Sequence, residues 1–399
     1  MQARCVWLIL VLAALPAGAG DWRGKFGVEA RLFANEPLFD TQFEEQVAFS
    51  IEPEYFHEWD DGRQRIVFAP FLRVDQRDKE RTHSDLREAY WQLSLNSAEI
   101  AVGLRRVFWG VTESVHLIDV INQTDFVENI DGEDKLGQPM VSVRWLNDWG
   151  TVDLFMLTGF RERTFPGNAG RPRLPLPIDR GATRYESSRE DKRVDVALRY
   201  SHYFGDFDIG LAHFSGTLRE PRFEIGLQPG MGNQITPSLF LIPNYDRLEQ
   251  TSLDLQATKG AMLWKLELLS RHNFDGRSTA FVAGFEYTLS GVFDSAVDLG
   301  LIAEYVFDDQ PITRTSFTND IALGGRVAFN DVQDTELLTF ALIDADTQTS
   351  LVSVEGSRRF GQSWRLSLEG RLFLNPDPQD FLFGLRDDDY VQLTLERFF

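Results

Sequence analysis

The chain has one cysteine and a shortage of basic residues, and both absences narrow what it can be. Cys5 lies among the first twenty residues, so the remainder can form no disulfide and no thiolate. There are 40 basic residues against 61 acidic ones, and the net charge of −21 argues against a nucleic-acid partner. The chain also lacks a long hydrophobic run, because Val6–Leu15 is shorter than the roughly 20 residues that a membrane-spanning helix needs.

The first twenty residues have the features of a secretory signal peptide. A single arginine precedes the apolar run, and Ala17 and Ala19 form an A-x-A cleavage site. We therefore expect residues 1–20 to be removed on export and residues 21–399 to form one mature domain.

Apolar and polar residues alternate with a period of two through most of the mature chain. In residues 364–374, 297–307 and 390–399, large apolar side chains alternate with charged or hydroxyl-bearing ones. Aromatic residues are abundant (32 Phe, 9 Tyr and 9 Trp), although the mean hydropathy is slightly negative. This combination favours a membrane β-barrel, apolar outside and polar within, over a large soluble β protein.

Eighteen segments show this pattern, and most have the roughly ten residues that a tilted transmembrane strand needs. An even number places both chain ends on the same side of the membrane. Sixteen strands also fit, and residues 222–228 and 238–244 could add one more hairpin. The eighteen segments are approximately 23–34, 43–57, 63–75, 85–95, 98–108, 139–147, 150–160, 192–204, 206–216, 249–258, 261–272, 279–289, 296–307, 318–329, 335–343, 348–359, 363–374 and 389–399.

Short connections alternate with long ones along these segments. The short ones carry turn residues, such as Asp60-Asp61-Gly62 and Lys259-Gly260. The long ones cover residues 109–138, 161–191 and 217–248. Tight turns at one end and long loops at the other predict an all-β transmembrane antiparallel barrel of about 18 strands.

The last segment ends on an aromatic residue, Phe399. A terminal aromatic on an amphipathic strand resembles the signal that the barrel assembly machinery recognises in bacterial outer-membrane proteins, although Arg397 stands where an apolar residue is more usual. We therefore expect the cell outer membrane as the location, with membrane lipid and lipopolysaccharide around the barrel. Porins of this size occur as homotrimers or as monomers, and both fit.

In a barrel, the alternation selects the side chains that face the lumen. Arginines prevail in the first half of the chain and carboxylates in the second, an arrangement that would set a transverse field and tune ion selectivity. The alternative is that these charges pair with one another and stiffen the wall. The candidate pore-lining residues are Arg65, Arg73, Glu88, Arg105, Arg144, Arg199, Glu267 and Glu304.

Residues 109–138 follow the fifth strand, as does the loop that folds inward and narrows the pore in general porins. We expect this third loop to fold inward here, with its acidic residues facing the arginines of the early strands. Residues 114–121 could form a helical turn with Thr112 or Ser114 near its N-cap. A cap loop with no role in the pore is the alternative. The candidate constriction residues are Glu113, Asp119, Asn122, Asp125, Glu128 and Asp131.

The stretch LRRVFWG…DVINQTDF…LGQPMVSVRW, within residues 104–145, resembles a pattern of uncharacterised proteobacterial porin-like outer-membrane proteins. The resemblance implies the barrel fold and the outer-membrane location, and no substrate. On a re-entrant loop, Asp119 and Asn122 could bond backbone groups and tether the loop to the wall. The matching positions are Trp109, Gly110, Asp119, Val120, Asn122, Asp125, Pro139 and Met140.

These patterns predict passive diffusion of small hydrophilic solutes. Phenylalanines 71, 155, 214 and 373 fall on the face of their strands that the alternation directs into the lumen. Because an aqueous pore has little need of phenyl rings there, they favour the alternative, a conduit or docking partner for lipid or hydrophobic cargo. The two predictions differ in whether the rings form a continuous apolar track or pack against the inward loop.

The six histidines show no diagnostic pairing with serine or acid, and the Asp-rich runs lack EF-hand spacing. We therefore expect no enzymatic activity, cofactor or metal.

Overall fold

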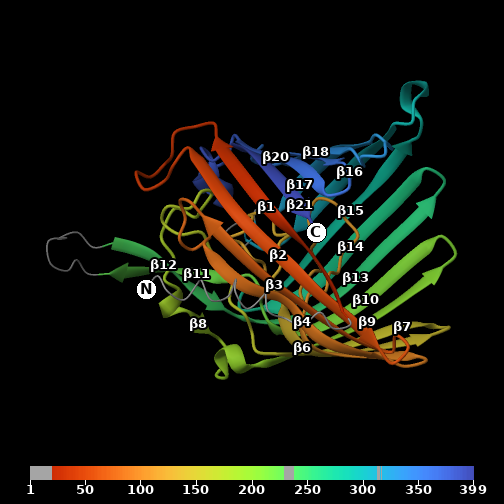
Figure 1. The fold of residues 1–399 in the computed structure, drawn as a ribbon. Coiled ribbons are helices and arrows are strands. Elements are labelled where there is room, and N and C mark those ends of the chain that lie inside the picture. Colours follow the sequence, from red (N-terminus) through yellow and green to blue (C-terminus); the bar gives the residue numbers. More distant parts are fainter. Residues whose placement is uncertain (1–19, 229–237, 312–314, 316) are drawn as a thin grey trace.

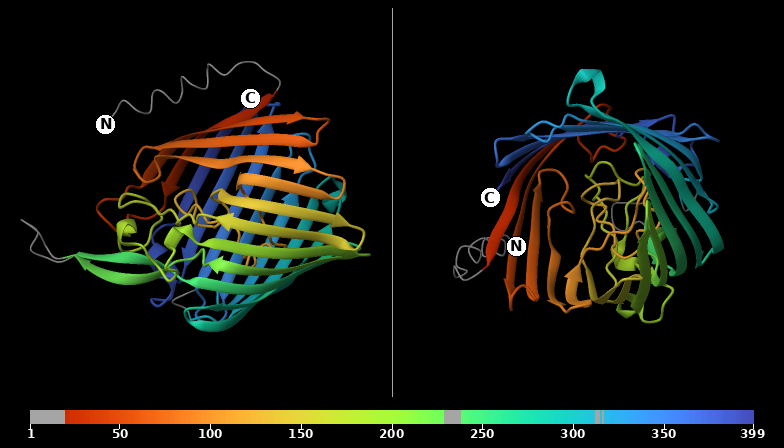
Figure 2. Two further views of the ribbon diagram at one scale, coloured as in Figure 1. Left: turned by 90° about the horizontal axis from the view of Figure 1, so that it is seen from below. Right: turned by 90° about the vertical axis from the view of Figure 1, so that its right-hand side faces the viewer.

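The protein is an all-β structure whose wall is a closed barrel of 18 antiparallel strands (Figures 1 and 2). The computed structural model describes residues 20–228, 238–311, 315 and 317–399, so the predicted signal peptide lies outside the described residues except for Gly20. Within the described residues, no helix is long and apolar enough to cross a membrane.

Each wall strand pairs with the wall strands before and after it in the chain, and β1 also pairs with β21, which closes the ring. The wall strands are β1 (Asp21–Phe33), β2 (Glu45–Trp59), β3 (Gln64–Asp75), β4 (His83–Ser94), β5 (Ala98–Arg105), β6 (Gln138–Asn147), β7 (Gly150–Thr158), β9 (Val194–Phe204), β10 (Phe207–Thr217), β13 (Arg247–Lys259), β14 (Met262–Asn273), β15 (Gly276–Leu289), β16 (Asp298–Asp308), β17 (Asn319–Ala328), β18 (Glu336–Asp344), β19 (Ser350–Phe360), β20 (Trp364–Leu374) and β21 (Tyr390–Phe398).

A small second sheet lies outside the wall, where the hairpin of β11 and β12 projects from one end of the barrel (Figure 1). The second sheet consists of β8 (Arg184–Tyr185), β11 (Arg222–Gln228) and β12 (Ser238–Tyr245). Short 3-10 helices are η1 (Arg180–Ala182), η2 (Glu190–Lys192), η3 (Val292–Asp294) and η4 (Phe381–Leu385).

The structure confirms the predicted fold class and strand number. Every predicted segment overlaps one wall strand, and the additional hairpin predicted at 222–228 and 238–244 exists as β11 and β12 without joining the wall. The fifth strand ends at Arg105, three residues earlier than predicted, so the third loop covers residues 106–137.

Burial along the strands is inverted relative to a soluble β protein. On β1, Glu29 and Arg31 are buried, whereas Val28 and Leu32 are exposed over 42% and 61% of their surfaces. A water-soluble strand would bury the apolar set and expose the charged set. The apolar outer face and polar inner face are those of a transmembrane barrel.

The two ends of the barrel differ, and we name them the turn end and the loop end. At the turn end, Gly205 and Gly260 have positive φ values of +59° and +64° in tight reversals, which a glycine adopts without steric cost. Aromatic pairs gather there, including Trp22 with Tyr55 and Trp264 with Phe285. Such a girdle marks the boundary between hydrocarbon and water. The long connections all lie at the loop end.

Candidate functional site

The third loop, residues 106–137 (L3 below), lies inside the ring of strands rather than above it (Figure 2). Its contacts reach opposite parts of the wall: Arg73 on β3, Glu267 on β14 and Arg371 on β20. L3 therefore crosses the interior, which confirms the predicted inward fold.

The first part of L3 is held by two carboxylates on the wall, Glu267 and Glu304, which we call the carboxylate clamp. Glu267 is fully buried and accepts hydrogen bonds from the backbone N–H groups of Val111 (2.8 Å), Thr112 (3.2 Å) and Ile118 (3.2 Å). It also accepts the Thr112 hydroxyl at 2.7 Å. A carboxylate that receives several backbone N–H groups makes strong, charge-assisted bonds.

Glu304, on β16, completes the clamp. It accepts the backbone N–H groups of Glu113 (2.9 Å) and Ser114 (2.8 Å), and also the Ser114 hydroxyl. The predicted helical turn over 114–121 is wrong, since no helix occurs there. The N–H groups that a first helical turn would leave free are used by the wall carboxylates instead.

The next part of L3 is held by three arginines from the side of β3 and β4, which we call the arginine anchor: Arg73, Arg81 and Arg87. Arg81 is buried and pairs with Glu29 (2.7 Å), while its other guanidinium nitrogens donate to the backbone carbonyls of Val127 and Glu128 (both 3.2 Å). Arg73 and Arg87 bind the carboxylates of Glu128 and Asp125. The anchor therefore neutralises the acidic residues that L3 brings inside.

Three residues of this region could in principle hold a metal ion. His83, Asp125 and Glu128 each offer one ligand atom, and these three atoms lie within 4.8 Å of one another. However, the Asp125 carboxylate already binds Arg87, and the Glu128 carboxylate already binds Arg73. A divalent cation would have to displace these guanidinium groups, so the cluster is better described as part of the arginine anchor.

The pKa of Asp125 makes the anchor sensitive to acid. Burial alone would raise this pKa, but the His83 imidazole 3.8 Å away, the charge of Arg87 and a hydrogen bond from Thr164 lower it to about 2. In the unfolded chain the value is ~3.9. Between about pH 4 and pH 2 the unfolded state binds more protons, so stability rises with pH there.

We therefore expect Asp125 to contribute roughly 2 kcal/mol above about pH 4 and to lose this contribution as the pH falls through about 2. Denaturant midpoints of the wild type and Asp125→Asn, measured in detergent from neutral pH downwards, should differ near neutrality and converge in acid. The exposed turn variant Asp61→Asn is the control. A constant gap between wild type and Asp125→Asn would contradict the assignment.

The last part of L3 contacts β20 and closes back on β5. Asp131 pairs with Arg371 at 3.0 Å, and the Asn129 side chain donates to Glu369 at 3.2 Å. Asn122 accepts the N–H of Val107 and donates to the carbonyl of Arg105, both at 2.8 Å. Asn122 thus has the tethering position that the sequence predicted.

Asp119 bonds within L3 rather than to the wall. It pairs with Lys135 (3.0 Å) and accepts the N–H of Trp109 (3.3 Å). It thereby closes the loop on itself.

Apolar side chains of the wall pack under L3. Phe155 and Phe214 belong to a buried cluster with Trp109, Ile118 and Ile121 of the loop. Phe373 is also buried, and Phe71 lies beneath the guanidinium groups of the arginine anchor at 4.3 Å from Arg87. The inward phenylalanines near L3 therefore secure the loop.

The eight predicted pore-lining residues all occupy inward positions of wall strands, but most have local partners. Arg144 pairs with Asp153 and Arg199 pairs with Asp254, each at 2.7 Å. The predicted division into an arginine half and a carboxylate half is wrong, because Glu29 and Asp153 lie among the early arginines, and Arg271 and Arg371 lie among the later carboxylates.

The predicted meeting of L3 acids with the early arginines holds only for Arg73. Arg65 donates to Gln92, and Arg105 donates to Ser142 on the neighbouring strand. Arg65 and Arg144 lie near the turn end of their strands, below the reach of a loop that enters from the loop end. Glu88 lies beside the entry to L3 and accepts the backbone N–H of Arg106 (3.3 Å).

Sequence reasoning missed the anchors that lie in loops, which have no alternation to reveal them. Arg81 is one; Arg171 is another, in the connection 159–193 (L4 below). Arg171 is buried, pairs with Asp388 at 2.6 Å and lies over the ring of Phe33. L4 thus reaches across the loop end from β7 to the connection before β21.

One side of the interior remains accessible. Inward-facing charges with 25–48% of the side chain exposed lie on β1, β2 and β17–β20, the part of the wall between the strands of the arginine anchor (β3 and β4) and those of the clamp (β14 and β16). We call this set the accessible wall. It consists of Lys25, Glu52, Glu54, Arg326, Glu336, Glu355 and Arg365. Glu133 of L3, with 59% of its side chain exposed, adds a further accessible carboxylate.

Fold and interior together define a transmembrane antiparallel β-barrel with an inserted third loop. No protein-family model and no curated protein matches the chain. Among solved structures, it is similar to the outer-membrane-expressed OmpT of Vibrio cholerae (10% identity, TM-score 0.46, covering 96% of this chain and 99% of that one). It is also similar to a double mutant of Rh. blastica porin (8% identity, TM-score 0.44, covering 95% and 100%). The fold assignment rests on the strand pairing of this chain itself.

Proposed function

We propose that this protein resides in the outer membrane and forms a channel for passive diffusion of small hydrophilic solutes. The observation that carries the proposal is the accessible wall: inward charges on β1, β2 and β17–β20 keep 25–48% of their side chains exposed, although Arg326 pairs with Glu113 of L3 and Glu52 lies 4.0 Å from Arg106 of L3. Charged groups that line a water-filled path select permeating solutes by charge and size.

The packing of the inward phenylalanines supports an aqueous path over a hydrophobic one. Phe155 and Phe214 lie beneath L3 against Trp109, so they offer no open surface to an acyl chain. Phe71 and Phe373 are also buried, and Phe71 lies beneath Arg87, so none of the four rings favours the alternative of a conduit or docking partner for lipid cargo.

We expect weak cation selectivity. The accessible wall has four carboxylates and three basic groups, and Glu133 on L3 adds a fifth carboxylate, while the exposed inward arginines Arg23 and Arg144 near the turn end offset part of this excess. Charges within about 8–10 Å of the path, one Debye length, affect permeating ions, whereas the loop charges outside do not.

The test is single-channel conductance and reversal potential of the purified, folded protein in a planar bilayer under a salt gradient. We expect a stable conductance with a cation-selective reversal potential, shifted toward anions in the double variant Glu133→Gln, Glu355→Gln. Glu249→Gln removes an exposed carboxylate from the outer face and is the matched control. A folded protein that conducts no current would overturn the proposed function, whereas an unchanged reversal potential would overturn only the selectivity.

A further inference from the structure

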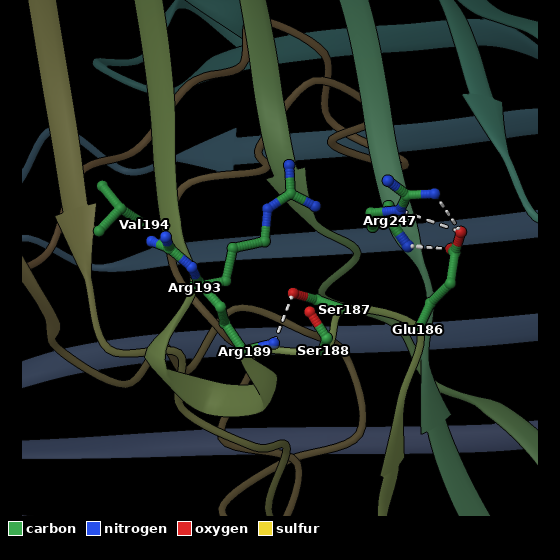
Figure 3. Close-up of a pocket in the computed structure, with 7 residues that line it drawn as sticks. All are labelled: Glu186, Ser187, Ser188, Arg189, Arg193, Val194 and Arg247. Atoms are coloured by element: carbon green, nitrogen blue, oxygen red, sulfur yellow. Dashed lines mark hydrogen bonds and ion pairs between the residues drawn. The ribbon is translucent and has the colours of Figure 1, made fainter.

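A hollow of about 530 Å³ lies at the loop end of the barrel, outside the channel interior (Figure 3). It is located where β10 ends: Thr217, the last residue of β10, pairs with Arg247 of β13, and Arg193 donates to the carbonyl of Gly216. The residues that line it are Glu186, Ser187, Ser188, Arg189, Arg193, Val194 and Arg247.

The hollow is positively charged. Three arginines face one carboxylate, Glu186, which is fully used by Arg247: it accepts both the side chain (2.8 Å) and the backbone N–H (2.8 Å) of that residue. Arg193 is held only loosely by Asp195 at 3.5 Å, and Asp195 also binds Arg219. Positive charge therefore remains without a matched partner inside the hollow.

Arg189 supplies the clearest free cation. Its guanidinium has no ion-pair partner among the residues that the structure describes, while its backbone N–H is bonded to Ser187. Two serine hydroxyls complete the polar lining (Figure 3). Guanidinium groups and hydroxyls in one recess match a phosphate, whose several oxygens accept bidentate bonds from arginine.

An apolar column starts at the same hollow. Val194 lines it and is the first of three exposed outward residues on β9, followed by Val196 and Leu198. Met156 and Leu154 on β7 pair with Val196 and Leu198 and are also exposed. A lipid-facing apolar surface thus begins where the cationic recess ends.

Near the loop end, the neighbouring outer face of β10 and β13 is polar and confines the start of this column to one side. Ser215 donates to Glu249 at 2.6 Å, and His213 contacts Thr251 at 2.9 Å and Glu249 at 3.5 Å. The Glu249 carboxylate would repel an anionic ligand placed over β10 and β13, so the favourable position lies over β7 and β9.

From this juxtaposition we propose that the hollow binds the phosphorylated head group of an anionic membrane amphiphile whose acyl chains lie along β7 and β9. Arg189 and Arg193 contact the phosphate, and Val194, Val196 and Leu198 contact the chains. A soluble anion would use the arginines but would gain nothing from the apolar column.

The test is a titration of the full-length folded protein in detergent with diphosphorylated lipid A, followed by native mass spectrometry of the fraction that retains one lipid. We expect Arg189→Gln to weaken retention about tenfold, the effect of losing one charge-assisted hydrogen bond. Arg184→Gln removes an exposed arginine of the same loop that pairs with Glu224 outside the hollow, and it should bind like the wild type. The salt concentration is kept low, because salt screens exposed charges.

Three further arms distinguish the possible ligands. A lipid A lacking phosphates but keeping its acyl chains should bind weakly; equal binding would overturn the proposal. Val196→Ser should also weaken retention, although it leaves every arginine in place. Full competition by millimolar inorganic phosphate, or equal loss in Arg189→Gln and Arg184→Gln, would likewise overturn it. Heat-modifiable gel mobility confirms that each variant is folded.

Discussion

Replacing both Glu267 and Glu304 by alanine is expected to raise the single-channel conductance severalfold and to turn a steady current into a fluctuating one. Four hydrogen bonds from L3 end on Glu267 and three on Glu304. A hydrogen bond to a charged group contributes ~1.5–3 kcal/mol, so even a fraction of these bonds holds the loop firmly. Without the clamp, residues 111–118 lose their position against β14 and β16, and the path widens.

The matched control is Glu336→Ala with Glu355→Ala, which removes two inward carboxylates of the accessible wall and leaves the clamp untouched. This control should change the reversal potential and leave the current steady. The clamp variant is a cleaner test than deletion of residues 114–133, because deletion also uncovers Phe155 and Phe214. An unchanged, steady conductance in the clamp variant would show that L3 does not limit the path.

The barrel itself could be predicted from the sequence because its signal is local. Each strand has its own alternation, as in residues 364–374, and each tight turn has its own residues, as at Gly260. The number of strands follows by counting these local signals. The same alternation gave the inward direction of Glu267 and Glu304.

What the inward groups contact could not be predicted in the same way. The groups that bond Glu267 belong to residues 111–118, which are 149 or more positions away in the sequence. They meet Glu267 only because the ring of strands closes and L3 folds inside it. The incorrect helical turn has the same origin: a local rule placed Thr112 at an N-cap, whereas its hydroxyl and N–H bond a carboxylate on the wall. Arg81 lies in a loop with no periodicity, so no pattern marks it as buried.

Arg81→Met is expected to destabilise the folded barrel by ~3–5 kcal/mol, the usual effect of removing one partner of a buried ion pair. Arg81 contacts Glu29 at 2.7 Å and Asp75 at 3.1 Å, and both carboxylates are buried. Its removal leaves Glu29 with Arg73 at 2.9 Å and Arg31 at 4.0 Å, and leaves Asp75 without its ion pair to Arg81. It also frees the backbone carbonyls of Val127 and Glu128. The measurement is the guanidinium midpoint of unfolding in detergent micelles.

Two comparisons separate charge from packing in this prediction. Arg77→Met removes a partly exposed arginine of the same loop that pairs with Glu45, and it should have little effect, since exposed pairs contribute ~0–1 kcal/mol. Arg81→Met combined with Asp75→Asn should recover part of the lost stability, because the second change removes the buried charge whose ion pair the first has taken away. If the double variant is less stable than Arg81→Met alone, the arginine acts through its contacts with the L3 backbone. In that case conductance, rather than stability, should report the loss of the anchor.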